Sequence, residues 1–391
     1  MFINNYQSIT ETETGDNDYS PGEQECMKPV VGVLTTRSSK SNKPYPSGKK
    51  ARLFKELIYY GNQKNIFIFF FASEGINWKE KTIEGYTYGE NKKWQSGVYP
   101  FPDIVYNRIL NRQIEEKKAI KLIIKRFTSD KNICFFNTRF LDKWEVHKAI
   151  SNSPEGQQFL PETVLLSRRK LKDFTTRYRE LFLKPRRGYR GKGVIKLKHF
   201  SGNVFQYACA GLPSIKWQKC SSFDLLYKQI KKIIKDDKRY ILQQAIDLCK
   251  YEGRIFDIRA QVQKNGRGIW AMTGAAVRVA EKNRFVTHIS NGGTAASYEK
   301  VIDAVCAKSD EMKAEINSQL RKVCVLIPWI LEKELGLTLA VLTLDIGLDS
   351  NGKLWIIEVN SKPGSFDEDD IRIQHLQNLV DFFIFAARSN N

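Results

Sequence analysis

Residues 341–364, VLTLDIGLDSNGKLWIIEVNSKPG, constrain the fold of this 391-residue chain more than any other stretch. Apolar-rich runs flank Asn351-Gly352, and this pair predicts a two-residue type I′ turn because both central positions need positive φ. The stretch is therefore expected to form a β-hairpin. Its expected apolar face pairs Leu348 with Trp355, Ile346 with Ile357, and Leu344 with Val359.

The other face of the hairpin is polar, with Asp345 opposite Glu358 and Thr343 opposite Asn360. Two carboxylates at directly opposed positions repel each other unless a cation lies between them. Asp345, Glu358 and Asn360 are therefore candidate ligands of Mg²⁺, with Mn²⁺ as the alternative ion. The competing interpretation is a solvated polar face that tolerates one repulsion.

At 391 residues the chain is long enough for two or three domains. Its 42% hydrophobic residues and seven Trp indicate a folded protein. The apolar run at 66–72, IFIFFFA, is too short to span a membrane and is expected to be a buried strand. Residues 1–27 lack Lys and Arg, so no signal peptide is expected. The protein is therefore expected to be cytoplasmic. The seven scattered cysteines, with no C-x-x-C pair, indicate reduced thiols.

The formal net charge of +20 raises the question of a nucleic-acid partner. The basic residues are spread along the chain, and the stretch at 228–239 belongs to an expected amphipathic helix with a solvated basic face. Sequence-specific nucleic-acid binding is therefore not expected, and an acidic or phosphorylated partner fits better.

Residues 1–27 carry six acidic residues and are expected to form a disordered tail. Strands expected at 30–36, 65–72 and 103–106 alternate with helices at 49–60 and 113–127, which predicts a small open α/β domain over 28–138. Arg37 and Arg108 follow strands of this sheet and could hold an anionic substrate, although surface salt bridges are the simpler explanation. Residues 139–391 are expected to form a second unit, ending in a helix at 371–388.

Residues 183–198, LKPRRGYRGKGVIKLK, are expected to form two strands around a loop containing Gly188, Gly191 and Gly193. Glycine amides can approach a polyphosphate closely, and Lys184 could neutralise its charge. The stretch lacks the G-K-[ST] ending of a Walker loop, and a strand follows it where a dinucleotide fingerprint has a helix. A simple tight turn is the alternative.

Residues 255–263, IFDIRAQVQ, alternate so that Asp257, Arg259 and Gln261 share one strand face. Asp257 can accept hydrogen bonds from ribose hydroxyls, and Arg259 can hold a phosphoryl or carboxylate oxygen. A cross-strand salt bridge on a sheet surface is the alternative.

The order of these motifs resembles the ATP-grasp superfamily over roughly residues 139–391. LQQAI at 242–246, DIR at 257–259 and IEVNSKPG at 357–364 are similar to motifs of the ribosomal-protein glutamate ligases. KPVVGVLTTR at 28–37 and FFNTRFLDKWEVHKAI at 135–150 look more specifically like the endospore coat-associated, YheC/YheD-like family. The resemblance implies an ATP-grasp fold of two α+β lobes, preceded by a small open-sheet α/β domain. The lid-bearing lobe would cover about 160–247 and the metal-bearing lobe about 248–391.

The resemblance also implies roles for individual residues. Lys143 and Lys184 would contact ATP, the loop containing Arg187, Gly188, Gly191 and Gly193 would close over the triphosphate, and Gln244, Ala245 and Ile246 would bind adenine. Asp257 would contact the ribose. Arg259 and Arg278, together with Asn291 of the N-G-G segment, would stabilise the oxygens of the transferred phosphoryl group or the acyl phosphate. The Mg²⁺ ions would be held by Asp345, Glu358 and Asn360.

The implied activity is an ATP- and Mg²⁺-dependent carboxylate–amine ligase acting through an acyl phosphate, linked to spore coat formation. Gln244, His288 and Ser290-Asn291 depart from the glutamate-ligase pattern, so glutamate transfer is not inferred. A nucleotide-binding coat scaffold and a kinase acting on a hydroxyl remain the alternatives.

Overall fold

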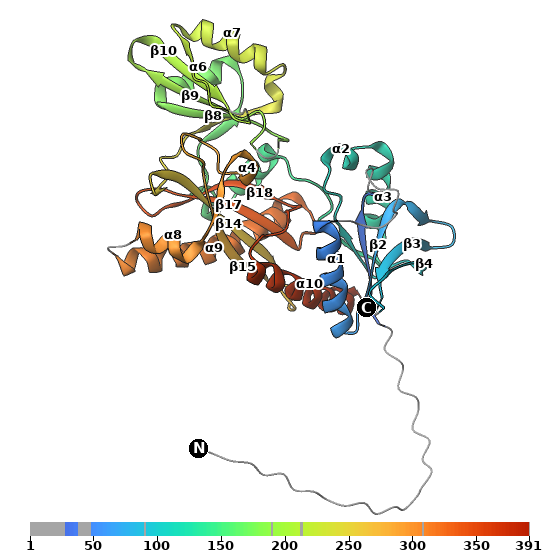
Figure 1. Cartoon of the computed structure of the whole chain (residues 1–391). Coiled ribbons are helices and arrows are strands. Elements are labelled where there is room, and N and C mark those ends of the chain that lie inside the picture. Colours follow the sequence, from blue (N-terminus) through green and yellow to red (C-terminus); the bar gives the residue numbers. More distant parts are fainter. Residues whose placement is uncertain are drawn as a thin grey trace, which may run out of the picture.

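Three sheets follow one another along the chain, and each forms a separate part of the structure (Figure 1). The computed structural model describes residues 28–37, 48–89, 91–188, 191–211, 214–306 and 309–390, with the side chains at 49, 50 and 390 excluded. The acidic tail predicted at 1–27 lies outside these residues.

The first sheet has the strand order β4-β3-β2-β1-β5-β6 and combines parallel and antiparallel pairs. Its strands are β1 (Val30–Thr35), β2 (Phe67–Asn77), β3 (Thr82–Tyr88), β4 (Trp94–Pro100), β5 (Ile104–Asn107) and β6 (Cys134–Phe136). Its helices are α1 (Lys49–Gln63), α2 (Arg112–Glu115) and α3 (Lys118–Ser129). The apolar run at 66–72 does form a buried strand, whereas the helix expected at 113–127 divides into α2 and α3. Strands β3, β4 and β6 were not predicted.

The second sheet is antiparallel, in the order β11-β10-β9-β8-β12-β7, and forms the lobe at the top of Figure 1. Its strands are β7 (Thr163–Leu165), β8 (Glu180–Pro185), β9 (Ile195–Phe200), β10 (Val204–Cys209), β11 (Gln218–Cys220) and β12 (Tyr240–Gln244). Two helices, α6 (Arg168–Arg177) and α7 (Phe223–Ile233), pack on it. Helix α7 buries Leu226 and Ile230 and exposes Lys228 and Lys232, as its amphipathic pattern predicts.

The third sheet has the order β16-β15-β14-β17-β18, with β13 paired to β14. Its strands are β13 (Lys250–Tyr251), β14 (Arg254–Lys264), β15 (Trp270–Val279), β16 (Thr294–Ser297), β17 (Val341–Leu348) and β18 (Leu354–Asn360). The remaining helices are α4 (Lys143–Ser151), α5 (Pro154–Gln157), α8 (Tyr298–Val305), α9 (Asp310–Leu335) and α10 (Asp369–Asn390).

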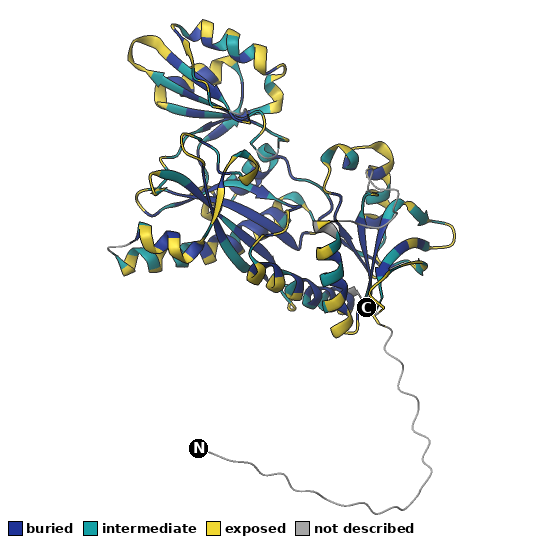
Figure 2. Cartoon of the chain, in the orientation of Figure 1, coloured by how far each residue is buried: buried dark blue, intermediate teal, exposed yellow. Residues whose placement is uncertain are grey.

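Strand β17 of this third sheet is buried along its whole length, and much of the sheet is dark blue in Figure 2. One face packs against α4, α8 and α9 through a core that includes Ile258, Val262 and Leu344. Helix α10 lies between the third sheet and the first, and its Leu376, Val380 and Phe383 share one core with strands β1 and β2.

The predicted hairpin forms, and its polar pairs are confirmed. Asp345 lies opposite Glu358, Thr343 opposite Asn360, and Leu344 opposite Val359. The predicted type I′ turn is wrong. Gly352 has a φ of 79° and its N–H donates to the Asp349 carbonyl, which makes a longer turn in which only the glycine is left-handed.

The Asp349 side chain stabilises this longer turn by accepting hydrogen bonds from the N–H groups of Asn351 and Lys353. A bulge follows at Ile357, so Ile346 pairs with Ile356 instead. The expected pairs of Ile346 with Ile357 and of Leu348 with Trp355 are therefore wrong.

The cysteines among the described residues (134, 209, 220, 249, 306 and 324) are free thiols. Within the same residues, the helices are too short or too polar to cross a membrane.

Candidate active site

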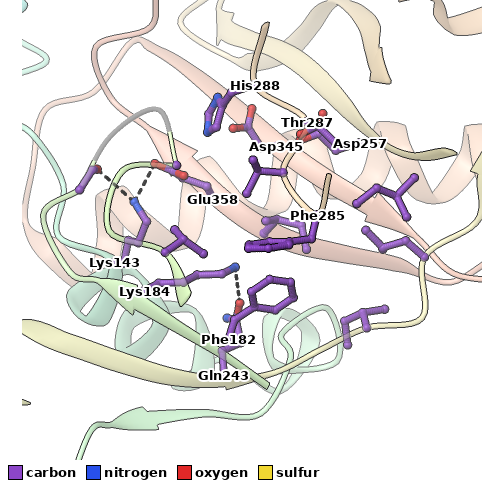
Figure 3. Close-up of a pocket in the computed structure, with 18 of the residues that line it drawn as sticks. Lys143, Phe182, Lys184, Gln243, Asp257, Phe285, Thr287, His288, Asp345 and Glu358 are labelled. Carbon is purple, nitrogen blue, oxygen red and sulfur yellow. Dashed lines mark hydrogen bonds and ion pairs between the residues drawn. The ribbon is translucent and has the colours of Figure 1, made fainter. Parts of the chain in front are cut away.

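A cavity with about 900 Å³ of empty space lies between the second and third sheets. Ten of the predicted site residues line it, and Figure 3 labels five of its charged members, Lys143, Lys184, Asp257, Asp345 and Glu358, among the lining side chains. Those ten are Lys143, Lys184, Gly188, Gly191, Gln244, Ile246, Asp257, Arg278, Asp345 and Glu358.

Lys143 reaches the cavity because Asp142 fixes the start of α4. The Asp142 carboxylate caps the helix by accepting from the N–H of Trp144 at 2.9 Å, and it also accepts from Arg186 Nε at 3.1 Å. Lys143 is therefore the first residue of the helix, and its Nζ lies 2.8 Å from Glu358 Oε1 (Figure 3). In this structure the ammonium group of Lys143 is the positive charge that pairs with Glu358.

Lys184 projects from β8 and is 9% exposed. Its Nζ donates to Gln243 Oε1 at 2.6 Å, and Gln243 donates in turn to Thr163 Oγ1 at 2.9 Å (Figure 3). Burial lowers the pKa of Lys184 to about 8; Lys143 also lowers this pKa, while Glu358 and Asp345 oppose the shift. Near neutral pH the group is a cation available to a phosphate.

Asp257, Arg278 and Asp345 form a buried charge cluster across β14, β15 and β17. Arg278 donates to both oxygens of Asp257, at 2.9 and 2.6 Å, and lies 2.9 Å from Asp345 Oδ2. Thr287 Oγ1 also donates to Asp257 Oδ2 at 2.6 Å. Burial alone would raise the pKa of Asp345, but the guanidinium groups of Arg278 and Arg259 outweigh it and hold that pKa below its usual range.

The second oxygen of Asp345, Oδ1, is buried and has no hydrogen-bond partner. A buried carboxylate oxygen is costly unless something binds it. Glu358 is directly opposite in the hairpin and also lines the cavity. The donor set therefore suits a hard divalent cation, which prefers carboxylate and amide oxygens. No cluster of three or more His, Cys, Asp or Glu occurs within the residues described.

Six singled-out residues lie outside the cavity lining. Arg187 pairs with Asp142 and Glu116, at 3.3 and 3.1 Å, and Arg259 lies over the ring of Phe366. The other four also lie near the cavity without lining it. Gly193 lies in the glycine loop and Asn291 lies beside Gly191. Ala245 directly follows β12, and Asn360 ends β18.

The apolar part of the lining was largely missed. Phe182, Val194, Leu248, Phe285 and Ile357 all face the cavity. Phe182 was detectable, because strand alternation puts it on the same face as Lys184. Ile357 faces the cavity because of the β18 bulge, and Phe285 lies outside any strand or helix, so neither had a periodic signal. Burial lowers the pKa of His288, another lining residue absent from the predicted set, which favours its neutral form.

A cavity between two antiparallel sheets, preceded by a mixed α/β sheet, defines an ATP-grasp protein. The crystal structure of the VanG D-Ala:D-Ser ligase from Enterococcus faecalis has the same fold, with a TM-score of 0.52, 13% identity, and coverage of 92% of this chain and 99% of that one. The model of the family described as "YheC/D like ATP-grasp" matches residues 132–385, and the chain belongs to that family.

Two relatives come from Bacillus subtilis (strain 168). The endospore coat-associated protein YheD is 29% identical over 357 residues, which cover 90% of this chain and 76% of YheD. The endospore coat-associated protein YheC is 27% identical over 273 residues, which cover 69% of this chain and 73% of YheC. Both the ATP-grasp fold and the family predicted from the sequence are thereby confirmed.

Proposed function

We propose that this protein is an ATP- and Mg²⁺-dependent carboxylate–amine ligase. The observation that carries the proposal is the pair of opposed carboxylates, Asp345 and Glu358, in the same cavity as two lysines. The unpartnered Asp345 Oδ1 supports a metal ligand there, and Asn360 at the end of β18 would complete the set. When bound, Mg²⁺ would neutralise phosphate charge during phosphoryl transfer.

The protein's own residues would bind and orient the reactants. Lys184 and Lys143 would hold the phosphates of ATP, and the glycine loop with Gly188 and Gly191 would cover them. Gln244, Ala245 and Ile246 would contact adenine, and Asp257 the ribose. We further propose that the lobe of about 160–247 closes as a lid over the lobe of about 248–391, with residues 28–138 as a separate domain.

In the proposed reaction a substrate carboxylate attacks the γ-phosphoryl group of ATP, which releases ADP and forms an acyl phosphate. An amine then attacks the acyl carbon, and inorganic phosphate leaves as the amide forms. Arg278, Arg259 and Asn291 would stabilise the phosphoryl and acyl-phosphate oxygens. No protein nucleophile is required, so positioning and electrostatic stabilisation would supply most of the rate.

ADP release in the presence of pooled carboxylates, amines and alcohols tests this proposal. An amide product identifies a ligase, a phosphorylated alcohol identifies a kinase, and bound nucleotide without turnover favours a scaffold. Glu358→Gln is expected to abolish turnover with the fold intact, whereas Glu74→Gln, an exposed control, is expected to leave it unchanged. A fully active Glu358→Gln protein would contradict the metal assignment.

A scaffold role is the second candidate, because the relatives YheD and YheC are named as endospore coat-associated. By the same similarity we propose that this protein acts in the cytoplasm during spore coat formation or in association with the coat. The paired carboxylates in the cavity favour an enzyme over a pure scaffold, which has little use for opposed negative charges.

A further inference from the structure

A second, smaller cavity lies between the first sheet, β14 and the segment that follows β18. It contains about 280 Å³ of empty space, part of it open to solvent, against about 900 Å³ for the first cavity, so it can admit only a small group such as a carboxylate. Arg108, Gln261, Gly364, Phe366 and His375 are among the residues that line it.

Four unpartnered polar atoms connect this cavity to the first one. Among the described residues, six buried side-chain nitrogen or oxygen atoms have no hydrogen-bond partner, and four of them belong to Arg259, Gln261, Thr343 and Asp345. In the sheet Arg259 pairs directly with Asp345, and Gln261 with Thr343, so all four side chains share one face of β14 and β17. We call these four residues the polar quartet.

Native proteins satisfy nearly all buried polar atoms, so four unsatisfied ones on one strand pair need an explanation. Asp345 lines the nucleotide cavity and Gln261 lines the second cavity, which places the polar quartet between the two. Residues two apart along a strand are separated by roughly 7 Å. A small polar ligand could therefore contact Arg259, Gln261 and Thr343, while Asp345 faces the proposed cation.

The charges around the quartet favour an anion. Arg108 is 7% exposed and donates to the Pro363 carbonyl at 2.8 Å. In the part of the chain that the structure describes, neither Arg108 nor Arg259 has a carboxylate within salt-bridge distance. Arg372, in the same cavity, is by contrast neutralised by Glu56 and Asp369.

His375 adds no positive charge to the cavity, since burial lowers its pKa to about 3, with Arg108 contributing. A buried guanidinium without an anion is costly, and a bound carboxylate would offset that cost.

We propose that the second cavity binds the non-reacting carboxylate of a small anionic substrate, held by Arg108 and Gln261, while the reacting end lies at Arg259, next to the cation that Asp345 would hold. This inference rests on the proposed function for the identity of the reaction, but the binding itself is independent of turnover. The substrate class is then a small molecule with a carboxylate in addition to its reacting group.

Calorimetric titration of the whole protein tests the proposal with matched acid and amide pairs: L-glutamate against L-glutamine, and L-aspartate against L-asparagine. Each is titrated with and without MgADP, which holds the nucleotide site without turnover. At least one acid is expected to bind roughly tenfold more tightly than its amide. Arg108→Gln and Gln261→Met are each expected to weaken that binding at least tenfold, and Arg108→Lys to restore part of it.

Melting temperature and MgADP affinity are expected to stay near wild type in these variants, and Arg267→Gln, an exposed control in the β14–β15 turn, to change nothing. The inference is overturned if no acid binds at millimolar concentration, if amides bind equally well, or if folded variants bind like wild type. Loss of MgADP binding alone would count against the proposed function, because the titrations without nucleotide test the second cavity separately.

Discussion

Lys184 is the cavity residue whose environment should bear most directly on the proposed binding of ATP. It is 9% exposed, hydrogen-bonded to Gln243, and its pKa of about 8 lies well below the ordinary value of 10.5 because of burial. The free protein therefore loses this positive charge just above neutral pH. Nucleotide binding should depend on whether the charge is present.

We predict that ATP binding takes up a proton at pH values just above 8. A phosphate beside Lys184 raises its pKa again, so the complex holds more protons than the free protein does in this range. Affinity should then fall as pH rises, by up to about tenfold per pH unit. Calorimetry in buffers of different ionisation enthalpy measures the proton uptake.

Two variants check this assignment. Lys184→Met should bind ATP weakly and without proton uptake, whereas Lys198→Met, which removes a lysine paired with Glu180 from the same sheet, should retain the uptake. Equal proton uptake in wild type and Lys184→Met would contradict the prediction.

Individual site residues were predictable where strand alternation fixed their direction. Asp345 and Glu358 were placed opposite each other correctly, because Leu344 and Val359 require burial and so set the register. The buried pairing of both Asp257 oxygens with Nε and Nη2 of Arg278 was not specifically predicted. Its partners come from strands joined by a turn, and only the observed register brings them together.

At the scale of elements, the loop between β8 and β9 combines glycines with contacts to the third sheet. Gly191 has a φ of 69°, and a Cβ there would come within 3.0 Å of Asn291 Nδ2. Gly202, in the turn between β9 and β10, has a similar φ of 76° with no atom within 4 Å of its Cβ position. Alanine substitutions at the two glycines would therefore cause similar backbone strain, but only the substitution at Gly191 would crowd a neighbouring side chain.

We predict that Gly191→Ala weakens ATP binding while Gly202→Ala does not. Both changes force a side chain into left-handed backbone, at a cost of about 1–2 kcal/mol, but only Gly191 lines the nucleotide cavity. Titration calorimetry gives the affinities, and thermal melting gives the common cost in stability. Equal ATP affinities for the two variants would show that the loop does not close on the nucleotide.

Helix and strand types were predictable in most of the chain, and turn geometry was less so. The Asn351-Gly352 pair correctly indicated a hairpin, yet the Asp349 side chain stabilises a longer turn that the pair alone does not specify. Strands β3 and β4 were missed because neither has the long apolar run that marked β2.

At the scale of the whole molecule, the first sheet is fixed to the β17–β18 hairpin and the segment after it by buried polar contacts. Asn137 donates to the carbonyl of Val341 at 2.6 Å and accepts from the N–H of Ala340 at 2.9 Å. Glu115 of α2 forms an ion pair with Lys362, whose side chain is completely buried. Partners more than 200 residues apart leave no local signal, so sequence patterns could not predict this interface.

We predict that Glu115→Gln and Lys362→Met each destabilise the protein by about 3–5 kcal/mol, because either change leaves one buried charge unpaired. The double variant should recover much of that loss, since no lone charge remains. Urea unfolding of the two single variants and the double variant measures the coupling. Single variants as stable as wild type, or additive losses in the double variant, would contradict a rigidly paired interface.

We propose that Asp345 and Glu358 form a metal-dependent nucleotide site. A thermal-shift titration of the protein with ATP alone, with Mg²⁺ alone and with both together is the measurement that tests this site. A ligand specific for the native state stabilises it by about 2.7 kcal/mol at a hundredfold excess over Kd, which raises the melting temperature. We predict a Mg²⁺-dependent shift with ATP that Asp345→Asn abolishes and the exposed control Asp224→Asn retains. No shift at millimolar ATP, or an equal shift in Asp345→Asn, would contradict the account.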